Sequence, residues 1–253
     1  MFNTTVADQI ATLTMSSAPV NALSEAWIAG LSCEIDKLAT RHDWKVLHLR
    51  SDQKVFCAGA DLKEMKGRLA APDGPDRTYF YVASIQRLYA RIEALPQVTI
   101  AELGGAALGG GFELALSCDL RIAATDAKLG LPEVRLGLIP GAGGTQRLTR
   151  LVGRGLANRL ILGAEVIDGT TAETIGLVQW AYPRAELPAR AAEIARRIAG
   201  LPAAALAAAK LCIASAADPG RGGYSDELEA TRKLQTDAET RERISAFLAG
   251  ARP

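Results

Sequence analysis

Apolar positions in the first three quarters of the chain fall into two patterns, short strand-like runs and longer stretches with helical spacing. The short runs predict strands at residues 9–15, 46–50, 98–103 and 120–124. The helical spacing predicts helices at residues 23–39, 78–95 and around 112–117. Ser24 is the expected N-cap of the first helix, and Pro96 ends the second. Strands and helices that follow one another in this way predict an α/β core.

The last quarter of the chain has a different character. Residues 189–211 and 224–248 are rich in Ala, Glu and Arg, have helical spacing and contain no strand-like run. The segment AADPGRGG at residues 216–223 separates them as a loop. We therefore expect a core at residues 1–186, which carries the active site, and a helical region at residues 187–253.

The length and the net charge of the chain limit the classes of protein to which it can belong. With 253 residues, 49% of them hydrophobic, the chain is long enough for one large compact domain with a modest appendage. The formal net charge of +1 gives no bulk attraction to nucleic acid or to an anionic membrane. Nothing resembles a signal peptide, and no apolar run reaches the roughly 20 residues that span a bilayer. A cytoplasmic protein without nucleic-acid or membrane partners is expected.

The cysteines show no spacing typical of metal ligands. Cys57 lies in the segment FCAGADLKEM at residues 56–65, whereas Cys33, Cys118 and Cys212 lie in apolar segments. Buried free thiols in a reducing compartment are therefore expected.

Histidine-based catalysis is not indicated either. His42 lies in a surface-like loop and His48 in an early strand, each without a recognisable partner motif. The chain also lacks the G-x-S-x-G nucleophile motif. Neither a catalytic triad nor a metal site is expected.

Two glycine-rich turns each lead into a predicted helix, GGAALGGG at residues 104–111 and PGAGG at 140–144. Such a turn exposes free backbone N–H groups and lets a ligand approach the main chain closely. Neither turn fits the dinucleotide-binding pattern, and the chain contains no nucleoside-triphosphate P-loop. On this pattern alone, the glycines either bind a ligand or serve only tight turns.

An acidic residue in an apolar setting lies close to each turn. Glu113 falls in the first turn of the helix after residues 104–111, and Glu133 lies in the apolar run LGLPEV at 129–134. A single Glu in the first turn of a helix is usually a favourable partner of the helix dipole. Two carboxylates among apolar neighbours suit general acid–base chemistry, in which one gives and the other takes a proton. Glu113 and Glu133 are the candidate catalytic pair.

Four segments of the chain resemble the enoyl-CoA hydratase/isomerase (crotonase) family. They are PVNAL at residues 19–23, FCAGADLKEM at 56–65, ALGGGFELALSCD at 107–119 and LGLPEVRLGLIPGAGGTQRL at 129–148. Because they occur in the family's order and spacing, the resemblance covers essentially the whole chain. It implies a spiral of ββα repeats with a C-terminal helical region that forms trimers, or hexamers built as dimers of trimers.

The resemblance also implies an acyl-CoA thioester as the substrate and no separate cofactor, since coenzyme A is part of that substrate. Glu113 and Glu133 match the family's catalytic carboxylates. The backbone N–H groups of Ala60 and Gly110 match the pair that holds the thioester oxygen. The implied substrate-binding positions are Val20, Ala22, Ala58, Ala60, Asp61, Leu62, Lys63 and Gly110.

Several reactions occur on this scaffold, so the family alone does not fix the chemistry. The presence of both glutamates favours an enoyl-CoA hydratase, because isomerases generally keep only the equivalent of Glu133. The alternatives are an isomerase, another crotonase reaction on a branched or aromatic acyl-CoA, and a non-catalytic RNA-binding relative. Acyl specificity is expected in residues 66–89, with Leu69, Tyr79, Phe80 and Val82 as candidate lining residues.

The sequence departs from the family pattern at several points. Glu102 stands in a strand that is usually apolar, and Gly104 replaces a common Asn. The usual Asn-Arg-Pro near the start is Ser-Ala-Pro at residues 17–19. Towards the C-terminus Gln235 replaces a frequent Phe, and the usual final Lys-Arg is Gly-Ala-Arg at 250–252. Contacts to the nucleotide end of coenzyme A are therefore expected to differ here.

Overall fold

A six-stranded sheet forms the centre of the computed structural model, which describes residues 1–216, 220 and 222–250. Its strand order is β1-β2-β3-β4-β6-β9, and all neighbours are parallel except the β1–β2 hairpin. The strands are β1 (Phe2–Ala7), β2 (Ile10–Met15), β3 (Val46–Ser51), β4 (Val98–Leu103), β6 (Leu120–Ala124) and β9 (Trp180–Tyr182). A small second sheet joins β5 (Ala107–Leu108), β7 (Leu129–Gly130) and β8 (Val166–Ile167).

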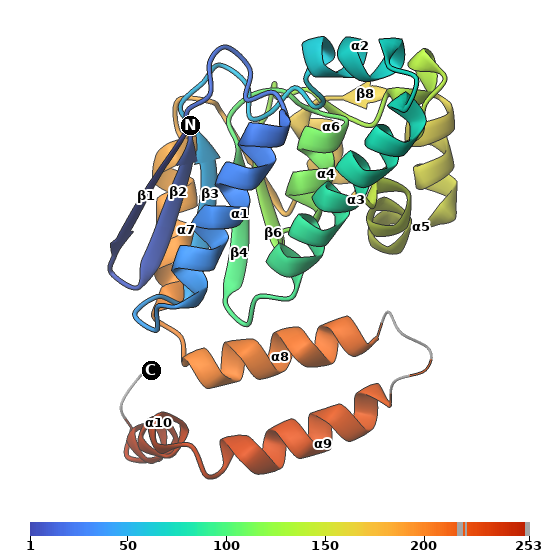
Figure 1. The fold of residues 1–253 in the computed structure, drawn as a ribbon. Helices are drawn as coiled ribbons and strands as arrows, with labels where there is room; N and C mark the ends of the chain where they lie inside the picture. The colour runs from blue at the N-terminus through green and yellow to red at the C-terminus, as the bar shows by residue number, and fades with distance from the viewer. Residues whose placement is uncertain (217–219, 221, 251–253) are drawn as a thin grey trace.

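Helices cover both faces of the central sheet. In Figure 1, α1 (Glu25–Ala39) and α3 (Gly74–Glu93) cross its front, and α7 (Leu187–Ala199) lies behind it. The short helix α4 (Gly110–Leu116) follows β5 and packs against α5 (Gly144–Leu162). The α/β class predicted from the sequence is confirmed. The remaining helices of this part are α2 (Leu62–Ala70), α6 (Gly169–Thr174) and the 3-10 turn η1 (Glu133–Leu136).

Local sequence signals explain why these elements start where they do. Ser24 caps α1 as predicted, because its side chain accepts a hydrogen bond from the Trp27 N–H. The apolar stripe of α1, which includes the fully buried Trp27 and Leu31, packs on the sheet. Every residue of β4 is buried, as expected for a central parallel strand with helices on both faces.

The C-terminal helices differ from the prediction in one respect. Residues 189–211 were expected to be helical throughout, but α7 ends at Ala199 and α8 (Ala203–Ser215) follows at an angle of 103°. Gly200 and Pro202 lie at the break, where proline removes a backbone donor and cannot continue the helix. Likewise residues 224–248 divide into α9 (Gly223–Leu234) and α10 (Ala238–Leu248), because the Asp237 side chain caps a new helix.

The predicted boundary at residue 186 stays a prediction. In the structure α7 packs against the strands of the core, whereas α8, α9 and α10 lie below the core (Figure 1). Lys210 of α8 ties this group to the base of the sheet, donating to the Gln97 carbonyl at 3.0 Å and to Asp119 at 2.8 Å. Within residues 1–216, 220 and 222–250, no single helix is long and apolar enough to span a membrane, and α7 with α8 meets that test only as a bent pair.

The predicted burial of the cysteines is partly wrong. Cys57 and Cys118 are buried, but Cys33 is exposed and Cys212 is half-buried. Cys33 falls on the solvent side of α1, away from the stripe that contains Leu31 and Ile35. All four are free thiols.

Candidate active site

Glu113 lies in the first turn of α4, directly after the first glycine turn. Its side chain is 2% exposed, and Oε1 accepts two backbone hydrogen bonds from the second glycine turn. The donors are the N–H groups of Ala142 at 2.8 Å and of Gly144 at 2.7 Å. The two turns that are separate in the sequence therefore meet at this carboxylate.

Two opposing effects act on the proton affinity of Glu113. Burial raises its pKa to about 7 from the ordinary value of 4.5, and the nearby Glu133 adds to the increase. The backbone donors Gly144 and Ala142, and the charge of Arg147, act in the other direction. The result is a carboxyl group that exchanges its proton near neutral pH, as a general acid–base residue requires.

Glu133 begins η1 and is half-buried. Burial raises its pKa as well. Its Oε2 is buried and has no hydrogen-bond partner in the described part of the chain. A buried carboxylate oxygen without a donor is costly when charged, so this site favours the neutral acid or a bound polar molecule.

The two carboxyl groups flank the backbone of Gly109 and Gly110. A Cβ placed on Gly109 would lie 3.1 Å from Glu133 Oε1, and one placed on Gly110 would lie 3.8 Å from Glu113 Oε2. Gly109 also has φ +53° and ψ −131°, a conformation that L-residues avoid. The backbone conformation requires glycine at position 109, where a Cβ would also crowd the Glu133 carboxyl group.

The backbone N–H groups of Ala60 and Gly110 lie on neighbouring segments. Cys57 and Ala107 form a parallel bridge, which sets residues 57–60 beside 107–110. A Cβ placed on Gly59 would lie 3.6 Å from the Gly110 nitrogen. Neither amide donates to a backbone acceptor within residues 1–216, 220 and 222–250, so both are free to bind an oxygen atom.

The other predicted substrate-binding positions lie around these amides. The Val20 carbonyl accepts from the Ala58 N–H at 3.0 Å. Asp61 caps α2, because its Oδ1 accepts from the N–H groups of Lys63 at 2.9 Å and Glu64 at 3.0 Å. Ala22 is half-buried, and Leu62 and Lys63 are exposed at the start of α2.

The four candidate acyl-lining residues fall in different places. Leu69, Tyr79 and Phe80 are exposed, the last two with their rings edge to face. Val82 lies against the second glycine turn, since a Cβ on Gly141 would be 3.1 Å from its Cγ1. Of the four, Val82 therefore contacts the turn that holds Glu113.

Sequence reasoning missed several side chains that support the site. Tyr89 donates from its hydroxyl to the Gly110 carbonyl at 2.9 Å, and Arg147 donates to the Ala142 carbonyl at 3.0 Å. Their partners lie 21 and 5 residues away in sequence, and no local pattern marks them. Helical periodicity predicts that the buried Tyr89 faces inward, but not which atom it contacts.

His48, which has no recognisable partner motif in the sequence, does have a partner in the structure. Its Nε2 lies 2.8 Å from Glu102 Oε2, and both side chains are buried. Glu102 is the residue that departs from the family's apolar strand, and β3 and β4 bring it beside the histidine. The pair belongs to the sheet rather than to the Glu113–Glu133 site.

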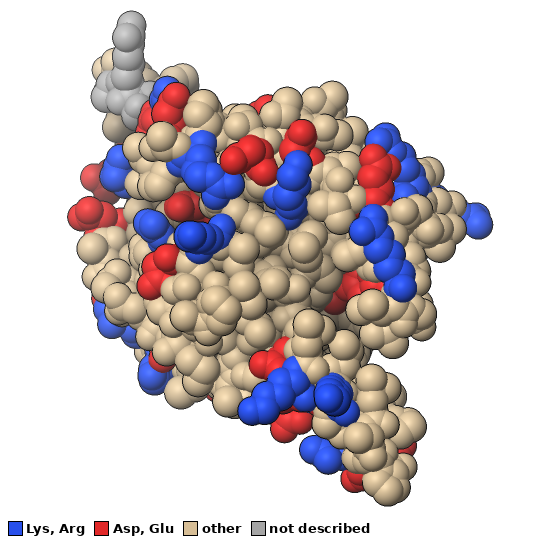
Figure 2. All heavy atoms as spheres, turned by 90° about the horizontal axis from the view of Figure 1, so that it is seen from above, with Lys and Arg blue, Asp and Glu red and all other residues tan. Residues whose placement is uncertain are grey.

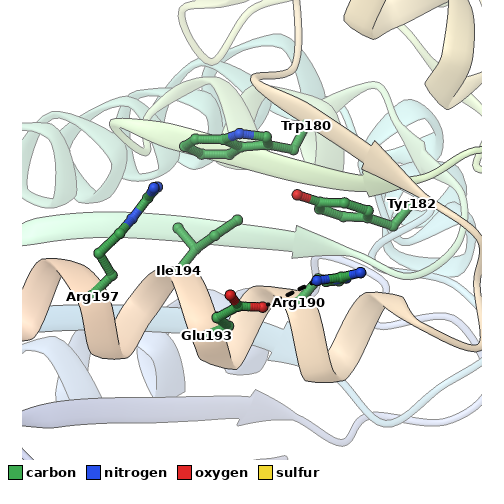
Figure 3. Close-up of a pocket in the computed structure, with 6 residues that line it drawn as sticks. All are labelled: Trp180, Tyr182, Arg190, Glu193, Ile194 and Arg197. Carbon is green, nitrogen blue, oxygen red and sulfur yellow. Dashed lines mark hydrogen bonds and ion pairs between the residues drawn. The ribbon is translucent and has the colours of Figure 1, made fainter.

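A separate pocket of about 170 Å³ lies between β9 and α7. Figure 3 shows Trp180 and Tyr182 on the strand side, and Arg190, Glu193, Ile194 and Arg197 projecting from the helix. Arg190 pairs with Glu193 at 3.3 Å. None of the predicted site residues lines this pocket.

Taken together, Glu113, Glu133, Ala60 and Gly110 form an arrangement suited to acid–base chemistry beside a carbonyl oxygen. Two free amides can stabilise negative charge on that oxygen, and two carboxyl groups with raised pKa can move protons near it. Among the described residues, no group of three or more His, Cys, Asp or Glu side chains could hold a metal ion.

Comparisons with known proteins agree with this arrangement. The family model for enoyl-CoA hydratase/isomerase matches residues 5–252. The chain is 37% identical to a 2,3-dehydroadipyl-CoA hydratase of Escherichia coli, over 90% of this chain and 87% of that protein. It is 45% identical to the mitochondrial methylglutaconyl-CoA hydratase of Mus musculus, over 62% of this chain and 49% of that protein.

The fold agrees with solved structures as well. The crystal structure of an enoyl-CoA hydratase from Geobacillus kaustophilus superposes with a TM-score of 0.93 at 34% identity, over 100% of this chain and 95% of that one. The crotonase-like spiral expected from the sequence is confirmed by this match.

Proposed function

Because the chain belongs to the enoyl-CoA hydratase/isomerase family, we propose that it is an enoyl-CoA hydratase, a carbon–oxygen lyase of acyl-CoA catabolism such as fatty acid β-oxidation. The reaction adds water across the double bond of a trans-2-enoyl-CoA and gives a 3-hydroxyacyl-CoA. The observation that carries this proposal is the pair of carboxyl groups, Glu113 and Glu133, on either side of Gly109 and Gly110. Two groups are needed because hydration takes one proton from water and gives one to carbon.

In the proposed mechanism, the thioester oxygen accepts hydrogen bonds from the N–H groups of Ala60 and Gly110. Negative charge grows on that oxygen when water attacks carbon 3 of the double bond. Fixed donors stabilise this enolate-like charge without reorganising, and the loss of one typically costs about 100- to 1,000-fold in rate.

Glu113 activates the water in this proposal, and Glu133 delivers the proton to the carbon beside the thioester. The two N–H donors on Glu113 Oε1 favour its ionised form, which a base needs. Glu133 Oε2 has no donor in the described residues, which favours the protonated form that an acid needs. Because the two groups are close, they titrate as a coupled pair.

Purified protein mixed with crotonyl-CoA should lose absorbance at the enoyl-thioester band. Glu113→Gln and Glu133→Gln should each lower kcat by about 100- to 10,000-fold. A failure to hydrate short, medium, branched and aromatic enoyl-CoA substrates would refute the proposal.

The division of roles has its own test. Each Gln variant is incubated with a saturated acyl-CoA in D₂O, and exchange of the proton beside the thioester is followed by NMR. The proposal expects exchange to be lost in Glu133→Gln and retained in Glu113→Gln. If exchange is instead lost in Glu113→Gln and retained in Glu133→Gln, Glu113 is the proton donor to carbon and Glu133 activates the water.

A second candidate function keeps the fold and changes the substrate or the reaction. It is an isomerase, or hydration of a branched or functionalised enoyl-CoA, and the names of the mouse and Escherichia coli relatives favour the latter. A series of straight, branched and dicarboxylic enoyl-CoA substrates separates these possibilities. An isomerase would retain most of its activity in Glu113→Gln.

We propose further that the protein acts without a cofactor or metal ion, in the cytoplasm, as a homotrimer or as a hexamer of two trimers. The four free cysteines fit a reducing compartment. Neither nucleic acid nor a membrane is a proposed partner. On the face shown in Figure 2, basic and acidic side chains are interspersed around a broad uncharged area, whereas RNA binding would favour a basic patch.

A further inference from the structure

We propose that Arg147 is a positioning residue for Glu113: it fixes the turn at residues 140–144, whose N–H groups hold the Glu113 carboxylate. The inference rests on the proposed hydratase function and extends it to a side chain that touches neither the carboxylate nor the free amides.

The turn is held from two sides. On the inner side, the N–H groups of Ala142 and Gly144 donate to Glu113 Oε1. On the outer side, Arg147 Nη1 donates to the Ala142 carbonyl at 3.0 Å, and Gln86 Nε2 donates to the Gly141 carbonyl at 2.6 Å. Ala142 therefore bonds to Glu113 through its N–H and to Arg147 through its carbonyl, so a shift of the guanidinium moves the donors.

Gly143 makes room for this contact. It has φ +106°, and a Cβ placed on it would lie 2.2 Å from Arg147 Nη1. A side chain at this position would therefore displace the guanidinium group. The second glycine turn then has a function beyond helix entry, because Gly143 lets the arginine reach the main chain.

The guanidinium is itself anchored by Glu93. Arg147 Nε and Nη2 donate to Glu93 Oε2 at 3.0 and 2.8 Å, and the Arg147 side chain is 11% exposed. Glu93 is the last residue of α3, which also carries Gln86 and Tyr89. These three residues share one face of the helix, since they are spaced by three and four positions. That face of α3 thus contacts the first glycine turn at Gly110 through Tyr89 and the 140–144 turn through Gln86. Its Glu93 reaches the second turn indirectly, through Arg147.

Arg147 also contributes charge to the site. The groups that act on Glu113 are Glu133 of η1, which raises its pKa, and Arg147 of α5, which lowers it. Tyr89 of α3 lies close enough for Glu113 to raise the pKa of the phenol. Removal of the Arg147 charge should therefore raise the pKa of Glu113 and shift the acid limb of kcat/KM to higher pH.

The experiment compares Arg147→Gln, Arg147→Lys and Glu93→Gln with Arg159→Gln as the matched control. Arg159 lies further along α5 and makes a similar pair with Glu165, through two hydrogen bonds of 2.6 Å. It makes no hydrogen bond to the 140–144 turn. Crotonyl-CoA hydration is measured as a function of pH for each variant, and stability is measured by thermal unfolding.

Arg147→Gln should lower kcat by about tenfold or more with a smaller change in KM, because a misplaced general base slows the chemical step rather than binding. In the pH profile of kcat/KM, the acid limb of Arg147→Gln should move to higher pH. In Arg147→Lys this limb should return to its wild-type position, because lysine keeps the positive charge, while kcat stays reduced. Glu93→Gln should give a smaller loss, and Arg159→Gln should match the wild type.

A second readout does not depend on turnover. The ¹³C shift of the Glu113 carboxyl, identified by its absence in Glu113→Gln, should titrate at higher pH in Arg147→Gln than in the wild type. Equal midpoints, together with a kcat loss no larger than that of Arg159→Gln, would overturn the inference. If the wild type fails to hydrate any enoyl-CoA but the midpoint still moves, the positioning role stands and the proposed function fails.

Discussion

At the residue scale, Glu113 combines a buried position with two backbone donors. Its carboxylate gains the N–H groups of Ala142 and Gly144, but burial outweighs them and brings the pKa to about 7. A base with this pKa is protonated in a large fraction of molecules at neutral pH and gives up its proton readily. Activity and stability should therefore both depend on pH through this one side chain.

Hydration should weaken as the pH falls below about 7, the value to which burial raises the Glu113 pKa. Protonated Glu113 cannot take a proton from water, so kcat/KM should decline about tenfold per pH unit well below that point. The measurement is a pH–rate profile with crotonyl-CoA. A profile that stays flat from pH 8 to about pH 5 would show that Glu113 is not the base.

The same carboxyl group should make the wild type less stable at higher pH. Its pKa is about 7 in the folded protein and near 4.5 when unfolded, so the folded state binds more protons between these values. Stability is therefore lost as the pH rises from about 4.5 to about 7. Glu113→Gln should raise the free energy of unfolding by up to about 3 kcal/mol at pH 8.

Urea unfolding at pH 5 and pH 8 checks this expectation. The advantage of Glu113→Gln over the wild type should shrink towards pH 5, where the native carboxyl is already neutral. A constant difference at both values would mean that the change arises from packing rather than from charge.

At the scale of elements, the His48–Glu102 pair shows how two neighbouring strands share a buried polar contact. Thr12 of β2 lies beside His48, and Arg50 of β3 lies 4.0 Å from the other Glu102 oxygen. The strand β4 is buried along its whole length, and apart from Glu102 and Thr99 its residues are apolar. A buried polar pair in such a strand adds little net stability, but each member depends on the other.

His48→Ala should destabilise the protein by about 2 kcal/mol or more, because Glu102 keeps only its longer contact to Arg50. His48→Leu with Glu102→Leu should be within ~1 kcal/mol of the wild type, since both buried polar groups leave together. The exposed Arg41–Asp43 pair supplies the control, where Arg41→Ala should leave the stability close to that of the wild type. The free energy of unfolding of all three variants is measured by denaturant unfolding. If the double variant is as unstable as His48→Ala, the expected coupling between His48 and Glu102 is contradicted.

Elements differ in how well their local sequence predicts them. The strands β4 and β6 lie at the predicted residues, because a short, mostly apolar run fits a strand buried on both faces. The β1–β2 hairpin was predicted only in its second half, since Phe2–Ala7 mixes exposed and half-buried positions at the edge of the sheet. The strands β5, β7 and β8 have two residues each, too few for any periodicity to appear.

At the scale of the whole molecule, the C-terminal helices expose much apolar surface. Ile213 of α8, Leu228 of α9 and Phe247 of α10 are 74%, 73% and 64% exposed. Within the described part of α8, Ser215 is the one buried residue, although most residues of the helix are apolar. Apolar surface of this extent is typical of an interface between chains, and it supports the proposed trimer.

Sedimentation velocity should give a particle of three or six times the mass of one chain. Leu228→Asp with Phe247→Asp should release smaller species, because a charge buried in an interface is strongly unfavourable. Arg232→Ala, which removes an exposed Arg–Glu pair of α9, serves as the control and should leave the assembly intact. A wild type that sediments as a single chain would refute the proposed trimer.

The amino-acid sequence is sufficient to predict the α/β class, the two glycine turns and the candidate pair Glu113 and Glu133. Each of these features lies in a short contiguous segment, in which the periodicity, the glycine spacing or the family motif can be recognised. Two of the positions at which the sequence departs from the family pattern, Gly104 and Gln235, lie within the described residues. A third such position, Arg252, lies outside them.

Which side chains and backbone groups contact one another is visible only in the folded structure. It joins the 140–144 turn to Glu113, Arg147 to Glu93 and His48 to Glu102, across 29 to 54 positions of sequence. It also turns α8 away from α7 at Gly200 and Pro202. The physical reason is the same in each case: a hydrogen bond depends on distances of about 3 Å and on direction, and chain folding, not local composition, sets both for residues far apart in sequence.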